Sequence, residues 1–158
     1  MRQLPDDFDP SVKAALDDAK TLIAAGDVPG ALNRYQAAWD ASIDALDHHH
    51  ASVIAHMAGV IESDPAKKHR WNAEALREAD AAPDRERIRG FYASLHNNLA
   101  FSHAMLGELD EALRQMERAV ASLADVEPGP YEDRVVAGTH AQFERVKAAI
   151  AERDGPKG

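Results

Sequence analysis

The sequence contains no cysteine among its 158 residues. Disulfide bonds, thiolate metal sites and a cysteine nucleophile are therefore excluded. No run of about 18 apolar residues occurs, so we expect no membrane-spanning segment. The first ten residues also contain no apolar stretch of signal-peptide length. These absences favour a cytoplasmic protein that does not act in a membrane.

Aromatic residues are scarce, at 6 % of the chain, although hydrophobic residues make up 45 %. A core of Ala, Leu, Val and Ile is therefore expected, as in helical globular proteins. The net charge is −9, from 27 acidic and 18 basic residues. Because this charge repels phosphate backbones, it disfavours nucleic-acid partners.

Familiar catalytic motifs are also missing. The sequence has no G-x-S-x-G, no P-loop and no dinucleotide-binding glycine fingerprint. Its paired carboxylates fall on predicted helix surfaces, where charge pairing explains them. We therefore expect no catalytic residues and no cofactor, and the chain is more readily interpreted as a binding protein than as an enzyme.

Eight histidines raise the question of a metal site. The motif H-E-x-x-H does not occur, and no two histidines have the four-residue spacing that places two metal ligands on one face of a helix. Three of the histidines form the cluster His48–His50. One interpretation makes this cluster a solvated first helical turn and His103 a packing residue. The alternatives are surface metal binding or a functional metal site. We adopt the first interpretation and predict no metal.

Prolines and glycines divide the chain into helices, since proline is tolerated mainly in the first turn. Asp9 is a predicted N-cap, Gly26 a predicted helix end, and Asp27 and Asp64 are further predicted caps. No alternating strand pattern competes, so the predicted fold class is all-α. The seven predicted helices cover about residues 10–25, 27–46, 47–62, 65–81, 84–106, 108–124 and 131–153.

Two predicted helix pairs share one pattern: a glycine, an alanine five residues later, a large residue, and another alanine. The four positions are Gly26, Ala31, Tyr35 and Ala38 in one pair, and Gly107, Ala112, Met116 and Ala119 in the other. This pattern resembles the tetratricopeptide repeat, and Trp71–Asp80 resembles the end of a second repeat helix. The resemblance implies one domain over residues 1–158, an antiparallel helix-pair solenoid. It would hold about three degenerate repeats, over about 10–46, 47–81 and 84–124, and a capping helix over about 131–153.

The resemblance also implies a concave groove, lined by the first helix of each pair, that binds a peptide or protein segment. The residues expected to line it are Lys20, His56, Ser94, Asn97, Asn98, Phe101 and Met105. The Asn97–Asn98 pair is unusual within a helix, and it either hydrogen-bonds a ligand or bridges neighbouring helices. Related repeats that bind a terminal carboxylate use a clamp of lysines and asparagines. Lys20 and Asn98 fit such a clamp, but Leu16 and Ser94 stand where it needs lysines.

The partner itself carries no signature in the sequence. The leading interpretation is a protein–protein interaction module. One alternative is a small-molecule or metal sensor, or an enzyme, that uses His56, His103 and the two asparagines. Another is a homo-oligomer whose groove holds its own terminal segment. Trp39 and Trp71 are expected to pack between helices rather than to form a ligand platform.

Overall fold

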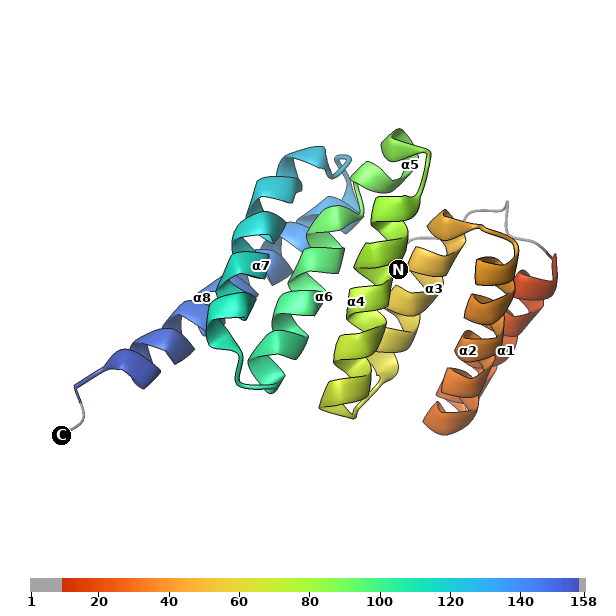
Figure 1. Cartoon of the computed structure of the whole chain (residues 1–158), viewed down its shortest axis with the longest axis horizontal. Coiled ribbons are helices and arrows are strands. Elements are labelled where there is room, and N and C mark those ends of the chain that lie inside the picture. The colour runs from red at the N-terminus through yellow and green to blue at the C-terminus, as the bar shows by residue number, and fades with distance from the viewer. Residues whose placement is uncertain (1–9, 157–158) are drawn as a thin grey trace. The chain divides into compact units, whose positions relative to one another are not determined.

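A computed structural model describes residues 10–156 and shows helices joined by short loops, with no strand among those residues (Figure 1). The helices are α1 (Pro10–Ala24), α2 (Val28–Asp44), α3 (His48–Ile61), α4 (Pro65–Ala81), α5 (Arg85–Arg89), α6 (Tyr92–Met105), α7 (Leu109–Ser122) and α8 (Pro130–Asp154). A 3₁₀ turn, η1 (Leu123–Asp125), follows α7. The predicted all-α fold class is confirmed. None of the described helices is both long enough and apolar enough to cross a membrane.

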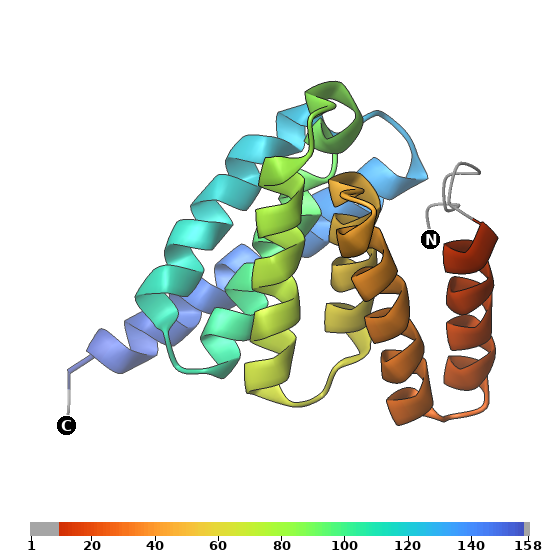
Figure 2. The same ribbon diagram turned by 45° about the vertical axis from the view of Figure 1, so that its right-hand side comes forward.

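Contacts along the chain divide it into two compact units, Met1–Arg85 and Glu86–Gly158. Unit 1 contains α1 to α4, and each of these helices packs against the next in an antiparallel arrangement (Figures 1 and 2). Unit 2 contains α6, α7 and α8, which all pack against one another. Its core cluster consists of Ala100, Ala112, Met116, Ala119 and Val146.

The alanines of the repeated pattern lie at helix contacts. Ala31, Ala38, Ala112 and Ala119 are each at most 2 % exposed. A methyl side chain allows two helix backbones to approach closely, and a larger one there would overfill the contact. The predicted burial of these four alanines is confirmed.

Aspartates begin three of the helices. The side chains of Asp27, Asp47 and Asp64 accept hydrogen bonds from backbone N–H groups three residues later, at 2.9, 3.1 and 2.9 Å. Each bond satisfies a donor that has no partner within its helix. The predicted caps Asp27 and Asp64 are confirmed, whereas the predicted cap Asp9 lies outside the described residues.

Three helices end in the same hydrogen-bonded turn with one left-handed residue. This residue is Gly26 with φ 80°, Leu46 with φ 56°, and Gly107 with φ 78°. In each turn the backbone N–H of the left-handed residue donates to the carbonyl three residues before it. The N–H of the following residue donates to the carbonyl five residues before that residue, and all these bonds are 2.8–3.0 Å long. Glycine takes this conformation without a steric penalty, but leucine does not. Leu46 is therefore strained, and its side chain is 75 % exposed.

The predicted single helix over 84–106 is wrong, because the chain turns at Gly90 and forms α5 and α6 instead. Glycine is a poor helix former. A Cβ at residue 90 would also lie 3.2 Å from the backbone oxygen of Asp125, so the α5–α6 turn passes close to the end of η1. The close approach depends on a residue far along the sequence, which local periodicity cannot reveal.

Candidate functional site

Five of the seven predicted groove residues lie on α6. They are Ser94, Asn97, Asn98, Phe101 and Met105. Apart from the adjacent Asn97 and Asn98, successive residues of this set are three or four apart, which places the set on one side of the helix. The other two, Lys20 on α1 and His56 on α3, belong to unit 1.

The C-terminal half of α6 exposes an apolar strip. Phe101 is 43 % exposed, Met105 is 41 % exposed, and Leu106 directly after the helix is 39 % exposed. Phe101 and Met105 are one helical turn apart, so their side chains are neighbours along the helix. Large exposed apolar side chains that adjoin one another mark contact surfaces more often than isolated ones do. We call Phe101, Met105 and Leu106 the α6 strip.

Polar groups on the same side of α6 are partly engaged within unit 2. The Ser94 and Tyr131 hydroxyls form a hydrogen bond of 2.6 Å, which joins α6 to α8. The side-chain oxygen of Asn97 is buried and accepts no hydrogen bond from residues 10–156. A buried acceptor without a donor costs free energy, so Asn97 is an unusual choice for a purely structural position.

Two histidines of α6 are tied to α7 or to the turn before it. His96 Nδ1 lies 2.8 Å from Gln115 Oε1, and Tyr92 stacks on the same imidazole ring with 5.9 Å between ring centroids. His103 Nδ1 lies 2.6 Å from Glu108 Oε2. These contacts hold α6 against α7, so both imidazoles support the helix that carries the α6 strip.

In unit 1, burial lowers the pKa of His56 to about 4. The imidazole is therefore neutral at physiological pH, with one ring nitrogen as a donor and the other as an acceptor. Lys20 is half-buried on α1. The structure thus distributes the predicted groove residues over three helices and both units, and their assignment to one binding groove stays a prediction.

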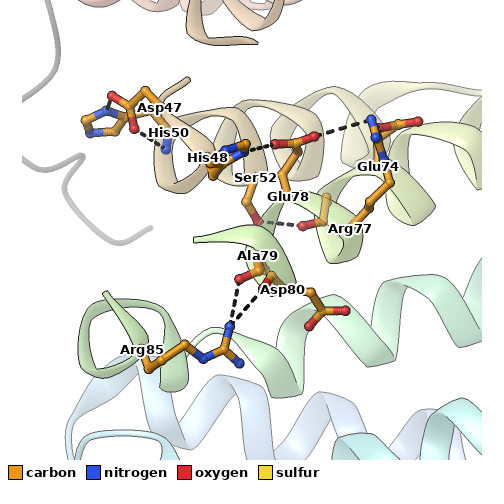
Figure 3. A network of polar contacts seen from close by, with 11 residues as sticks. Asp47, His48, His50, Ser52, Glu74, Arg77, Glu78, Ala79, Asp80 and Arg85 are labelled. Atoms are coloured by element: carbon orange, nitrogen blue, oxygen red, sulfur yellow. Dashed lines mark hydrogen bonds and ion pairs between the residues drawn. The ribbon is translucent and has the colours of Figure 1, made fainter. Parts of the chain in front are cut away.

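A polar network that the sequence did not reveal joins the start of α3 to the end of α4 (Figure 3). His48 Nδ1 lies 2.7 Å from Glu78 Oε2, and the other carboxylate oxygen of Glu78 lies 3.3 Å from Arg77. Arg77 also pairs with Glu74. Glu78 is only 3 % exposed, so its charge needs these partners in place of water.

Two further polar contacts lie nearby, one within the start of α3 and one between α3 and α4. The carboxylate of Asp47 contacts His50 Nδ1, and His50 is 5 % exposed. The hydroxyl of Ser52 donates to the carbonyl of Ala75 at 2.6 Å (Figure 3). The interpretation of His48–His50 as a solvated turn is therefore wrong for His50, which is buried against its own N-cap.

Chemically, this network resembles an oriented histidine–carboxylate pair, in which the carboxylate fixes the imidazole. The nearby hydroxyl of Ser52 is no nucleophile, because Ser52 is fully buried and its proton is already donated to Ala75. We assign the pair between His48 and Glu78 to the stability of the α3–α4 contact.

The opposite end of that contact is held by a lysine. Lys68 Nζ donates to the carbonyls of Gly59 and Val60, at 2.6 and 3.3 Å, and so binds the C-terminal end of α3. Burial lowers the pKa of Lys68, and the nearby charge of Glu62 opposes that shift. A cation is favourable at this end of a helix because the last carbonyls carry partial negative charge.

Packing accounts for the two tryptophans. Trp39 on α2 and Trp71 on α4 meet edge to face, with 5.9 Å between their ring centroids and 86° between their planes. Aromatic pairs prefer this geometry. The expected packing role is confirmed for this pair.

Among residues 10–156, no three histidine, aspartate or glutamate side chains are grouped so that they could hold a metal ion. On α6 the described residues offer an exposed apolar strip with amide groups beside it. In comparisons with protein-family models and with curated proteins, the sequence matches none.

Proposed function

We propose that this chain is a protein–protein interaction module of the tetratricopeptide-repeat type, and that α6 carries its contact with a peptide segment of a partner. The observation that carries the proposal is the exposure of Phe101 and Met105 one turn apart on α6. Adjacent apolar anchors of this kind supply most of the binding energy at protein interfaces.

The amides on the same side of α6 support a peptide as the ligand. A peptide offers backbone N–H and C=O groups along its whole length, and an asparagine side chain can pair with both. Asn98 precedes Phe101 by about one turn, so a polar and an apolar contact would follow one another along the bound segment. The buried oxygen of Asn97 is not part of this contact.

The repeat architecture is supported by two helix–turn–helix segments that share a left-handed glycine in the turn and a buried alanine in the helix after it. Gly26 and Gly107 take the same left-handed conformation, and the alanines five residues later, Ala31 and Ala112, are fully buried. In repeats of this type, the first helix of a pair faces the groove, and α6 would be such a helix.

A random peptide library displayed on phage and selected against the immobilised protein tests the proposal. We expect enrichment of peptides with apolar residues, followed by measurable binding of a fluorescent copy in solution. Asn98→Ala combined with Phe101→Ala should weaken that binding by about tenfold or more, since each truncates a central contact. Met105→Gln, at an exposed position, should weaken binding with an unchanged melting temperature.

Arg118→Ala, on an exposed position of α7, is the matched control and should bind as the parent does. Selection that enriches no peptide would refute the proposal. So would an affinity that Met105→Gln and the double variant leave unchanged while both remain folded.

A further inference from the structure

We propose that unit 1 binds a second copy of this chain head to tail, through two surfaces at opposite ends of α3. The first surface, the acidic end, consists of Asp44, Leu46 and Asp40 at the α2–α3 turn. The second surface, the basic end, consists of Val60, Lys67 and Arg70 at the α3–α4 turn. The proposal uses neither the α6 strip nor the peptide-binding function.

Leu46 is the centre of the acidic end. Its side chain is 75 % exposed, and its backbone takes the left-handed conformation that glycine takes at the two equivalent turns. A strained residue whose large apolar side chain points into water is poorly explained by the stability of the fold. Such outliers are found where a residue serves a contact.

The charged residues nearest to Leu46 in the sequence are acidic. Residues 40–48 contain three aspartates and neither lysine nor arginine. Asp47 is engaged as the cap of α3, and Asp40 accepts a hydrogen bond from Gln36 at 2.9 Å. Asp44 is exposed and lies two residues from Leu46. An apolar side chain beside carboxylates fits an apolar surface that carries cations.

The basic end offers that chemistry. Val60 is 58 % exposed, and the bond from Lys68 Nζ to its carbonyl places the start of α4 beside it. Lys67 and Arg70 are exposed, and neither forms an ion pair with any residue of 10–156. The nearby acids are occupied, because Asp64 caps α4 and Glu62 bonds the backbone N–H of Asp64.

Leu46 and Val60 are the two most exposed large hydrophobic residues among those described. Leu46 lies just before α3 and Val60 lies in its last turn, and the 14 residues of α3 span about 21 Å. The two surfaces are therefore distinct, opposite in charge and far enough apart to be occupied at the same time. A contact between two unlike surfaces leaves one of each free on the pair, so further copies can add to form a chain or a ring rather than a closed two-fold dimer.

Sedimentation velocity of the full chain at rising concentration and low salt tests this inference. We expect the mean sedimentation coefficient to rise with concentration and to fall when salt screens the charges. Leu46→Ala should weaken the association by about tenfold, since it removes the central apolar contact. Asp44→Lys should also weaken it, whereas Asp17→Lys on the exposed side of α1 should not.

A charge-swap experiment separates this contact from nonspecific association. Asp40→Lys with Asp44→Lys reverses the acidic end, and Lys67→Asp with Arg70→Asp reverses the basic end. Each of these two variants should remain monomeric alone, and an equal mixture should associate again. All substituted positions are exposed, and circular dichroism verifies that the helices remain.

A parent chain that stays monomeric at every concentration in low salt would overturn the inference. Association that persists unchanged in Leu46→Ala and Asp44→Lys would also overturn it, because the contact would then lie elsewhere. A mixture of the two charge variants that fails to associate would have the same meaning.

Discussion

Replacing Leu46 by glycine should raise the stability of the protein, although the substitution removes a leucine. Leu46 has φ 56°, and its two turn-closing hydrogen bonds match those of the Gly26 and Gly107 turns. A left-handed conformation costs a residue with a Cβ roughly 1–2 kcal/mol. Glycine removes this cost.

Two terms oppose the gain. The unfolded chain gains backbone freedom with glycine, which costs roughly 0.5–1 kcal/mol. The leucine side chain is 75 % exposed, so its loss removes about a quarter of the stabilisation of a buried leucine, roughly 0.5 kcal/mol. The net expectation is a small gain, at most about 1 kcal/mol.

A comparison with alanine is sharper, because Leu46→Ala loses the side chain and keeps the strain. We expect Leu46→Gly to exceed Leu46→Ala by about 1 kcal/mol.

Urea unfolding followed by circular dichroism measures the free energy of unfolding of each variant. Gly26→Ala is the mirrored test, because a Cβ added at Gly26 meets no atom within 4 Å and the substitution adds only backbone strain. It should destabilise by about 1 kcal/mol. If Leu46→Gly is no more stable than Leu46→Ala, the left-handed turn is not strained and the argument for a retained contact residue loses its basis.

Two further substitutions test the core and the half-buried imidazole of His56. Ala112→Leu should lower the free energy of unfolding by about 1–3 kcal/mol, because it overpacks the core cluster of unit 2. Ala121→Leu, on the exposed side of the same helix, should change it little. Equal stability of the two variants in urea would contradict the packing assignment. His56 has a pKa of about 4 in the folded protein and an ordinary pKa of 6.5. Between these pH values the unfolded chain binds a proton at His56 that the folded chain does not bind. The free energy of unfolding should therefore fall as the pH drops from about 6.5 to about 4, by up to about 3 kcal/mol. His56→Gln should reduce this pH dependence, measured as the free energy of unfolding at several pH values, and an unchanged slope would show that His56 titrates normally.

The sequence predicted the helix ends best where one residue decides them. Asp27 and Asp64 cap helices through their own side chains, and Gly26 and Gly107 take a conformation that few other residues tolerate. These signals act over three to five residues, so a single sequence contains them. The turn at Leu46 carried no such signal, because leucine has no preference for it.

Features that depend on distant residues could not be predicted. The turn at Gly90 lies close to the backbone oxygen of Asp125, and the buried Glu78 pairs with His48, which is 30 residues away. The same limit applies to the candidate site. Helix periodicity placed Ser94 on the same side of the helix as Phe101, but the hydrogen bond of its hydroxyl to Tyr131 follows only from the packing of α8 on α6.

The position of Lys68 determines whether a lysine-modifying enzyme can reach its amine. Its Nζ is held by the last carbonyls of α3, while the adjacent Lys67 is exposed. An acetyltransferase or a ubiquitin ligase that meets the intact protein can therefore use Lys67 and not Lys68. Lys68 becomes a substrate only after α3 and α4 have separated, so a modification on it would record that the protein had opened.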